Sequence, residues 1–547
     1  MTLKGAPTEG PVSRRALLVG GWSVLGVPVL AACLGRKSKG KKGSGSAASG
    51  NAGSGSAGAS ASGSAGASGG SGQGVTRTVS TVGATLKVTV GPAVVSNDVM
   101  VVPLAAHLDK AGSGGLSSDG KEFDVHLAWD RNDRFSGADG VRLVDLDAGT
   151  VQETFKASSQ STSLTDKEPD ATLHALFKPV DAKTVNVLVP ESGLFEGVPV
   201  VRDGKLSEEA KKALENTYDT ESSPDPVALE TFTASVDGAS DTRVTGKSVT
   251  ITLASDVLFD SDSADLSAQA DTTLKKAADQ LSTYPGGQVT IVGHTDDVAD
   301  DAHNQDLSNR RAQAVADRLG QLTSMSAYSV SVSGKGESEP RVPNDSDENR
   351  QLNRRVEITL VPTESTSTKF DAGKDPSGKG GGDLPRAEGP VAKGSEGVAV
   401  KRGSGEDKLT FVLKEVSRRG KYLVGEVKAT GGPGSTDVGP ADWLQPTQLA
   451  GSARGEEDTK LLGAITGLSL LTAQTRYYPV DYTTAKGTHH PLSEITADNK
   501  LGDGDATTLT VVWPDTGQDT VTLDLEPSKR PTRPNNPFRL TDIPVKR

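Results

Sequence analysis

The chain contains one cysteine, few aromatic residues and, beyond residue 33, no long apolar run. A single cysteine among 547 residues excludes an intramolecular disulfide, an iron–sulfur cluster and a cysteine-rich zinc site, because each needs several thiolates. Aromatic residues form only 4% of the sequence. Because a membrane-spanning helix needs about 20 consecutive apolar residues, we expect no such helix after residue 33.

An excess of basic residues is also absent. Lysine and arginine total 59 against 71 aspartates and glutamates, which gives a formal net charge of -12. Binding to a nucleic-acid backbone calls for a basic face, so we expect no nucleic-acid partner. The length and the 34% hydrophobic fraction allow two to four domains with cores of their own.

The first 33 residues have the features of an export signal. Arg14 and Arg15 precede an apolar stretch at 16–32 that contains helix-disturbing glycine and proline. The stretch ends in Leu-Ala-Ala-Cys, which resembles the lipobox of bacterial lipoproteins, and the paired arginines resemble a twin-arginine export signal. The resemblance implies that Cys33 is lipidated and becomes the mature N-terminus. The alternative is an uncleaved anchor that ends in a small residue.

A flexible tether is expected next, at 34–75. Residues 36–42 are rich in lysine and arginine, which attract anionic lipid headgroups. Residues 43–74 are almost wholly Gly, Ser and Ala, without apolar periodicity. We therefore predict an exported protein held at a membrane through lipidated Cys33. The composition favours the outer face of a plasma membrane, and an outer membrane stays open as the alternative.

Two regions, 76–204 and 397–547, are predicted to be all-β and sandwich-like. The first contains short runs of β-branched or alternating apolar residues separated by Gly, Asp and Asn turns. A connector at 205–245 contains one expected helix at 206–217, in which acidic residues come first and lysines later, as the helix dipole favours. A Gly-, Pro- and Lys-rich linker is expected at 364–396.

The second β region looks like a divergent copy of the first. Residues 140–155 can be aligned with 467–482, and residues 173–200 with 509–545. Both regions end with an apolar strand, a loop and a final Pro-Val. We therefore predict two related β domains that flank a different central domain.

Between 246 and 363 the pattern changes to strands that alternate with amphipathic helices. This predicts a central α/β domain of the βαβαβ type with a mixed sheet. Ser308 is a candidate N-cap for a helix whose buried stripe includes Ala312, Val315 and Leu319. The expected strands are VTITL (249–253), QVTIVG (288–293), YSVSVSG (328–334) and RVEITLV (355–361).

Five short motifs follow one another within this central region. They are VLFDSDSADLS (257–267), GHTDD (293–297), NQDLSNRRA (304–312), GKGESEP (334–340) and NRQLNRRVEI (349–358). In this order and spacing they resemble the OmpA-like peptidoglycan-binding domain. The resemblance implies non-covalent binding of the diaminopimelate of the peptidoglycan stem peptide.

The resemblance also assigns the ligand contacts. The main contacts fall on Asp296 in GHTDD and Arg311 in LSNRRA. Neighbouring pocket positions fall on Leu307 and Asn304, and Asp262 falls in a loop that touches the ligand in relatives. These assignments rest on the match to the family motifs.

The chemistry of the two main residues suits this ligand. Diaminopimelate ends in a zwitterion, so Asp296 can accept its ammonium, while Arg311 can grip its carboxylate with two parallel hydrogen bonds that lysine cannot reproduce. The alternative is an ordinary salt bridge between the two residues. Arg355 is expected to brace the site, and Arg310, about 100° around the helix from Arg311, is expected to be a solvated charge.

Other candidate sites are weaker. Asp260, Asp262 and Asp265 lack the glycine and the terminal glutamate of an EF-hand. His489-His490 are adjacent in an expected loop, where two side chains rarely share one ion without further ligands. His294 has no GxSxG or HExxH pattern beside it, so we assign it to the hydrogen bonding of the sheet. We expect no metal, no cofactor and no catalysis.

The sequence therefore predicts a non-enzymatic module that tethers the cell envelope to peptidoglycan. One alternative is a wall hydrolase that uses the carboxylates at 260–265 and 296–301. The other is an envelope scaffold whose β domains bind a protein partner while the central domain docks on the wall.

Overall fold

The computed structural model describes most of the chain after residue 72. The described residues all fall within Gly63–Arg547. Cys33, with the lipobox, and most of the tether lie outside them. Among the residues described, no helix is both long and apolar enough to cross a membrane. The described residues are 73–81, 83–112, 124–126, 137–157, 163–219, 225–363, 383–401, 408–433, 439–440, 443–444, 462–484, 486–496, 501–527 and 536–547.

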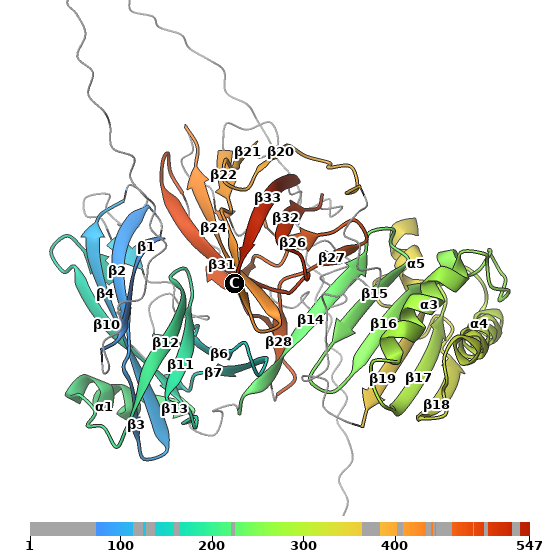
Figure 1. Cartoon of the computed structure of the whole chain (residues 1–547), viewed down its shortest axis with the longest axis horizontal. Helices are drawn as coiled ribbons and strands as arrows, with labels where there is room; N and C mark the ends of the chain where they lie inside the picture. Colours follow the sequence, from blue (N-terminus) through green and yellow to red (C-terminus); the bar gives the residue numbers. More distant parts are fainter. Residues whose placement is uncertain are drawn as a thin grey trace, which may run out of the picture. The chain divides into compact units, whose positions relative to one another are not determined.

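The first β region is built mainly from antiparallel strands (Figure 1). In β2, Leu86, Val88 and Val90 are fully buried and alternate with more exposed residues, which is the period of a strand with one face on a core. The strands are β1 (Val75–Thr81), β2 (Ala84–Val90), β3 (Ala93–Ser96), β4 (Val99–Lys110), β5 (Asp124–His126), β6 (Arg142–Asp145), β7 (Thr150–Glu153), β8 (Lys156–Ala157), β9 (Ser163–Thr165), β10 (Asp170–Phe177), β11 (Thr184–Val189) and β12 (Gly193–Arg202).

The second β region has a core of its own, in which the rings of Phe411 and Phe538 stack 4.8 Å apart. Its strands are β20 (Val391–Lys393), β21 (Val398–Lys401), β22 (Lys408–Val412), β23 (Val416–Arg419), β24 (Tyr422–Gly431), β25 (Leu462–Ala464), β26 (Leu468–Leu471), β27 (Thr475–Tyr477), β28 (Asp481–Thr483), β29 (His489–Pro491), β30 (Glu494–Thr496), β31 (Ala506–Pro514), β32 (Thr520–Leu525) and β33 (Phe538–Lys546).

The two β regions share one pattern of strand pairing. In the first, β4 pairs antiparallel with β2, β3 and β10, and β11 pairs with β6 and β12. In the second, β24 pairs with β22, β23 and β31, and β32 pairs with β26 and β33. In both, the last strand also runs parallel to a short one, β12 with β3 and β33 with β23. This matching topology supports the internal repeat, while the sandwich-like stacking of each region stays a prediction.

Strand β14 (Val227–Ser235) connects the two β regions with the central sheet. It pairs antiparallel with β7 of the first region, with β27 and β28 of the second, and with β15 (Ser240–Val244). An apolar cluster that includes Leu188, Leu229 and Tyr482 packs around it. The segment expected to be a connector thus contributes strands β13 (Thr217–Asp219), β14 and β15, besides the predicted helix, α1 (Glu208–Glu215).

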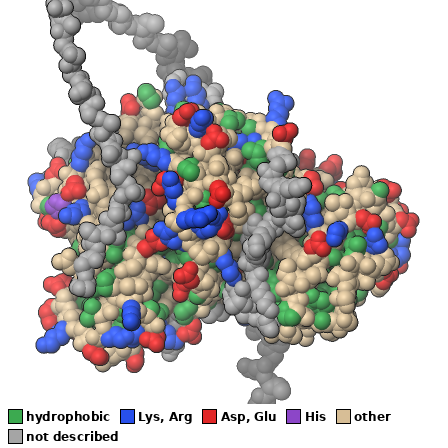
Figure 2. All heavy atoms as spheres, viewed as in Figure 1, with side chains coloured by type: hydrophobic (Ala, Val, Ile, Leu, Met, Phe, Trp, Pro, Cys, Tyr) green, Lys and Arg blue, Asp and Glu red, His purple; other side chains and the backbone are tan. Residues whose placement is uncertain are grey.

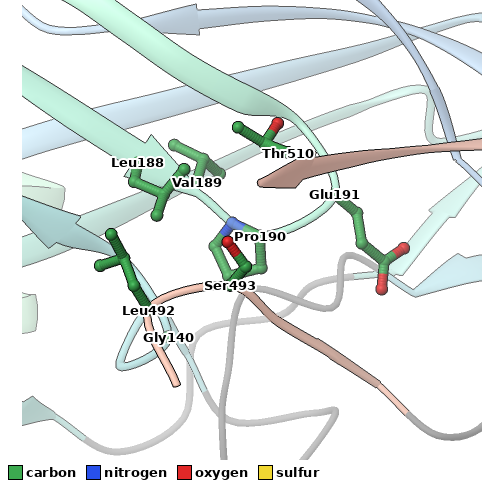
Figure 3. Close-up of a pocket in the computed structure, with 8 residues that line it drawn as sticks. All are labelled: Gly140, Leu188, Val189, Pro190, Glu191, Leu492, Ser493 and Thr510. Atoms are coloured by element: carbon green, nitrogen blue, oxygen red, sulfur yellow. The ribbon is translucent and has the colours of Figure 1, made fainter. Parts of the chain in front are cut away.

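A small cavity lies where the two β regions meet (Figure 3). Pro190 and Glu191, after β11, line it together with Leu492, Ser493 and Thr510. Its volume is about 10 Å³, which is room for about one water molecule. No organic ligand fits in it.

The central domain is a mixed sheet in the order β15-β16-β19-β17-β18. Only β17 and β18 run parallel, and the other neighbours are antiparallel. The helices α3 and α4 bury Leu274 and Leu319 against sheet residues such as Ile291 and Ile358. The four strands predicted here are confirmed. The elements are β16 (Val249–Ala254), β17 (Gly287–His294), β18 (Tyr328–Gly334), β19 (Arg355–Pro362), α2 (Ser255–Leu258), α3 (Ala270–Leu281), α4 (Asp301–Leu322) and α5 (Asp347–Asn353).

Helix α4 begins earlier than the sequence suggests. Its N-cap is Asp300, whose side chain accepts a hydrogen bond from the backbone N–H of His303 at 3.0 Å. Ser308 lies inside the helix, fully buried, and its hydroxyl donates to the carbonyl oxygen of Gln305 and accepts from the N–H of Gly336. The prediction that Ser308 caps this helix is therefore wrong, because Asp300 provides a cap two turns earlier.

The face in view of the folded part mixes charges of both signs. Figure 2 shows Lys and Arg side chains interspersed with Asp and Glu. Such a mixed surface favours solubility. It differs from the continuous basic stripe that nucleic-acid binding uses.

Two glycines allow the sheet to approach α4 closely. A Cβ atom on Gly293, in β17, would lie 2.2 Å from the carbonyl oxygen of Ser308, and one on Gly334, in β18, would lie 2.3 Å from the Ser308 hydroxyl. The helix backbone therefore rests directly on the ends of both strands, next to the GHTDD loop.

We predict that Gly293→Ala lowers the free energy of unfolding by about 1–3 kcal/mol, because the added methyl group collides with helix backbone that cannot move away. Gly320→Ala, on α4 where nothing lies within 4 Å of the new Cβ, should instead raise it by about 0.5–1 kcal/mol. Urea denaturation of both variants measures the difference. Equal effects of the two substitutions would contradict the close approach.

Candidate functional site

The candidate site lies where the central strand β19 begins. Its first residue pairs with Ala254 of β16 on one side and with His294 of β17 on the other. Both neighbours run antiparallel to β19, so the residue before β19 lies beside the residues that follow β16 and β17. Arg354 is therefore placed between Asp256 and Asp296.

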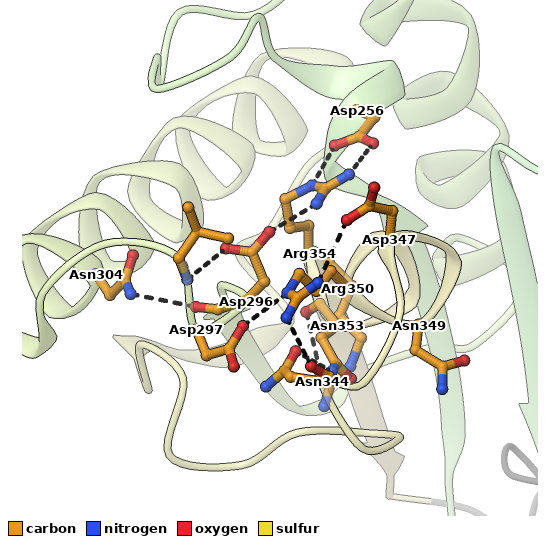
Figure 4. Close-up of polar contacts among 12 residues, drawn as sticks. Asp256, Asp296, Asp297, Asn304, Asn344, Asp347, Asn349, Arg350, Asn353 and Arg354 are labelled. Atoms are coloured by element: carbon orange, nitrogen blue, oxygen red, sulfur yellow. Dashed lines mark hydrogen bonds and ion pairs between the residues drawn. The ribbon is translucent and has the colours of Figure 1, made fainter.

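Arg354 links these two aspartates (Figure 4). Its Nε and Nη2 donate to the two carboxylate oxygens of Asp256 at 2.8 and 2.7 Å, and its Nη1 donates to Oδ2 of Asp296 at 2.6 Å. The side chains of Arg354 and Asp296 are 28% and 12% exposed. The hydrogen bonds to Asp256, and after them those to Asp296, raise the pKa of the Arg354 guanidinium, while burial acts against them.

Asp296 keeps one carboxylate oxygen with little to bind it. Among the described residues, its Oδ1 accepts only a long hydrogen bond, 3.4 Å, from the backbone N–H of Val298. Val298 itself is 75% exposed. The oxygen that Arg354 does not hold can therefore receive another donor.

Asn304 holds the loop that carries Asp296. Its Nδ2 donates to the carbonyl oxygens of Asp296 and Ala299 at 3.1 and 3.2 Å, and to Oε2 of Glu337 at 2.6 Å. Asn304 is 3% exposed, and Leu307, one turn further along α4, is 5% exposed. Both residues predicted to line the pocket are thus buried, and Asn304 acts on the backbone of the loop.

Arg311 is buried without an ion pair. It is 4% exposed, and no carboxylate within the described residues lies within 4.0 Å of its guanidinium. Its Nε donates to the carbonyl oxygen of Ser263 at 2.8 Å, its Nη2 reaches that of Asp260 at 3.5 Å, and it lies over the ring of Phe259 at 5.2 Å. Burial lowers the pKa of Arg311, and the charge of Asp256 opposes this shift.

The structure does not join Asp296 to Arg311 in the salt bridge that the sequence left open. Asp296 pairs with Arg354, and Asp296 acts on Arg311 only as a charge at longer range. The adjacent Arg310 is half-exposed and pairs with Asp306 one turn earlier on α4, at 2.8 Å. Two neighbouring arginines thus have different environments, one solvated and one buried.

Two further pairs lie near this loop. Asp262, whose backbone has a positive φ of 56°, accepts a hydrogen bond from Nε2 of His303 at 2.6 Å, and its side chain is 66% exposed. Arg350 of α5 donates to Asp297 at 2.9 Å and to the carbonyl oxygen of Asn344 at 2.9 Å (Figure 4). Asp297, in the acidic loop, is therefore tied to the chain before β19.

Arg355 makes contacts that stabilise the start of β19. Its Nε donates to Glu357 at 2.6 Å, and its Nη1 and Nη2 donate to the carbonyl oxygens of Asn353 and Glu339, both at 3.2 Å. The residue is 5% exposed, and this burial lowers the pKa of its guanidinium.

His294 does not take part in the hydrogen bonding of the sheet through its ring. It is 2% exposed, and neither ring nitrogen has a hydrogen-bond partner among the described residues. Burial first, and then the charge of Arg355, lower its pKa to about 4. His294 lies in the ladder of the sheet as expected, opposite Arg355 of β19, while its ring is a neutral buried group at pH 7.

Sequence reasoning missed Arg354, Asp256 and Phe259. Arg354 and Arg355 stand side by side in the NRR motif, and only the second was singled out. The register of β19 between β16 and β17 is the signal that separates them, because it puts Arg354 beyond the strand ends, between two aspartates. Pairing of these strands is not visible in the motif itself.

Metal ligands do not gather at this site. Of the Asp260, Asp262 and Asp265 carboxylates, that of Asp262 bonds to His303. Within the described ranges, possible metal ligands gather in another part of the chain. Glu230, Asp481 and His489 each offer one ligand atom there, and these atoms lie within 4.8 Å of one another.

Comparison with known proteins defines the class of this part of the chain. Residues 258–354 match the model of the OmpA family. The central part of the chain therefore contains an OmpA family domain, which carries the Arg354–Asp296 pair and Arg311.

The chain spans between about a third and just over half of the length of two curated relatives that it matches. The chain is 42% identical to outer membrane porin F of Pseudomonas aeruginosa over 105 residues, which is 19% of this chain and 30% of the relative. It is 36% identical to the probable lipoprotein YiaD of Escherichia coli over 126 residues, 23% of this chain and 56% of the relative. Among solved structures, the cell wall anchor of the T6SS from Pseudomonas aeruginosa is 34% identical, with 23% of this chain and 88% of that chain covered and a TM-score of 0.21.

We predict that His294 makes the stability of this domain depend on pH. Its pKa in the folded chain, about 4, lies below the ordinary value of 6.5, so between these values the unfolded chain binds a proton that the folded chain does not. The free energy of unfolding therefore falls as the pH drops from 6.5 toward 4, by on the order of 3 kcal/mol for this group. Denaturation of the wild type and of His294→Phe across this range measures it; the same slope in both would contradict the assignment.

Proposed function

We propose that the OmpA family domain binds peptidoglycan non-covalently, through the diaminopimelate of the stem peptide, in an exported lipoprotein that tethers the cell envelope to the wall. OmpA-like domains generally bind peptidoglycan, which supports the substrate class. The observation that carries the proposal is Arg311, a buried guanidinium without a carboxylate within ion-pair distance in the described part of the chain. A buried charge of this kind is costly unless a partner arrives.

A ligand carboxylate is the partner that suits Arg311. Its Nε is used by the carbonyl oxygen of Ser263, whereas its Nη2 makes only a long contact and its Nη1 donates to none of the described residues. The two terminal nitrogens can therefore grip a carboxylate with two parallel bonds. Each such charge-assisted bond contributes roughly 1.5–3 kcal/mol.

Asp296 is the acceptor for the ligand ammonium in this proposal. Arg354 holds its Oδ2, which fixes the direction of the carboxylate, and leaves Oδ1 with the long contact to Val298. An ammonium at Oδ1 adds a second cation to the carboxylate without displacing the first. Arg354 also donates hydrogen bonds to both carboxylate oxygens of Asp256. It can therefore lose its bond to Asp296 and still be paired with a carboxylate.

The remaining predicted residues support these two. Asn304 fixes the loop of Asp296 through its carbonyl oxygen, and Leu307 fills the space beneath the ligand with apolar surface. Asp262 lines the entrance from the Ser263 loop, and Arg355 braces the first residues of β19. None of these side chains needs to change its bonding for the ligand to enter.

We also propose the cellular arrangement. Lipidated Cys33 anchors the chain, the segment 34–75 gives the folded part reach, and a polymeric wall raises the lifetime of binding through many neighbouring stem peptides. The two β regions then serve as the part that meets a protein partner. A relative with the printed name of probable lipoprotein is consistent with such an anchor.

Sedimentation with purified sacculi tests the proposed site. We expect the full chain to co-sediment with sacculi, free diaminopimelate to compete, and Asp296→Asn or Arg311→Lys to reduce binding at least about tenfold. Lys keeps the charge of Arg311 but cannot make two parallel bonds to a carboxylate. Asn keeps the size of Asp296 but loses the charge that holds an ammonium.

Arg310→Lys is the matched control, because Arg310 is solvated and should not matter. Full retention of binding by the Asp296→Asn, Arg311→Lys double variant would refute the assigned site. Release of soluble muropeptides during the same incubation would favour a hydrolase instead.

A further inference from the structure

Three strands outside the OmpA family domain bring two acids and a histidine to one face. Glu230 of β14 is the register partner of Asp481 of β28, and Thr483 of β28 is the partner of His489 of β29. Residues two apart on a strand point to the same side. Glu230, Asp481 and His489 therefore stand on one face of three adjacent strands.

These three side chains are close together and buried. Glu230 is 5% exposed and Asp481 is 1% exposed, and the side chain of His489 is 9% exposed. Nε2 of His489 lies 2.5 Å from Oδ2 of Asp481, and one ligand atom from each of the three residues lies within 4.8 Å of the others. Two carboxylates directly opposite each other on neighbouring strands repel, so this placement calls for positive charge.

Arg243 supplies positive charge beside Glu230. Arg243 of β15 donates from Nη2 and Nε to Oε2 of Glu230, at 2.6 and 3.3 Å. Asp481 receives the imidazole of His489, whose other nitrogen, Nδ1, is buried and has no hydrogen-bond partner among the described residues.

We propose that Glu230, Asp481 and His489 form a binding site for a divalent transition-metal ion of the zinc type. Two carboxylates and one imidazole are ligands that zinc accepts, at about 2.0–2.2 Å, with a fourth position left for water. A tetrahedral arrangement at such lengths separates ligand atoms by about 3.3 Å. This separation falls between the 2.5 Å from Nε2 of His489 to Oδ2 of Asp481 and the 4.8 Å within which all three ligand atoms lie.

A metal ion at this position has a structural consequence. β14 comes from the segment between the first β region and the central domain, whereas β28 and β29 belong to the second β region. The ion would join them by bonds that cross the β14–β28 pairing, close to the shared apolar cluster that contains Leu229 and Tyr482. It would therefore stabilise the connection through which all three folded regions meet.

Equilibrium dialysis of the full chain against zinc chloride tests this site. After treatment with a chelator, we expect the wild type to take up one zinc ion at micromolar concentration, with a rise in Tm on zinc addition. Cobalt in place of zinc should give the visible absorption of a four-coordinate site. Glu230→Gln and His489→Ala should each weaken zinc binding at least about tenfold, as expected for the loss of one ligand.

His490→Ala is the matched control. His490 follows His489 on β29, points to the other face and packs against Tyr482 with 5.7 Å between ring centroids. The His490→Ala variant should therefore bind zinc as tightly as the wild type. Glu230→Gln keeps the size of the side chain, and circular dichroism checks that each variant is folded. Absence of zinc uptake by the folded wild type, or equal uptake by folded His489→Ala, would overturn the proposal.

Discussion

The hydrogen-bonded bridge from Asp256 through Arg354 to Asp296 is the interaction on which the candidate site depends. The two aspartates follow β16 and β17, and the arginine precedes β19, which runs between them. One guanidinium thus fixes the ends of three strands at the place where the GHTDD loop leaves the sheet. Without it, two carboxylates would lie close to each other at the edge of the fold, and like charges at short range would push the loop outward.

The bridge also decides what Arg311 can do. Because Arg354 already occupies Asp296, Arg311 has no strong anion to bind and rests on backbone carbonyl oxygens and on the face of Phe259. These contacts orient the guanidinium without neutralising it. The site is therefore held in position before a ligand arrives. Binding to such a site loses less conformational entropy than binding to a site that must first assemble.

Much of the fold of the central domain could be predicted from local patterns. The four strands follow from alternating or β-branched runs such as residues 288–293. An alternation of apolar and polar residues with a period of two indicates a strand with one buried face. The start of α4 was missed because the acidic stretch before Ser308 carries little apolar periodicity, and only the side-chain bond from Asp300 to the His303 N–H fixes the first turn. Helix starts depend on such single contacts more than on composition.

The site was predictable only in part, for a similar reason. Motif positions pointed to Asp296 and Arg311, but the partner of Asp296 depends on strand register, which brings Arg354 from 58 residues away along the chain. The place of His294 in the sheet could be predicted, but the state of its ring could not, because only the packing around a histidine shows whether its ring is hydrogen-bonded. The Glu230, Asp481 and His489 group likewise needs the pairing of β14 with β28, which joins residues that are about 250 positions apart.

The binding of two stem tripeptides tests the central claim most directly. The peptides differ only in the third residue, diaminopimelate or lysine, so that both present a side-chain ammonium and only one adds a carboxylate beside it. Titration calorimetry with the full chain should give at least about tenfold tighter binding of the diaminopimelate peptide, which corresponds to roughly 1.4 kcal/mol, and this difference should vanish in Arg311→Lys. Equal affinity of the wild type for the two peptides would contradict the account, because it would leave the buried guanidinium of Arg311 without a role in recognition.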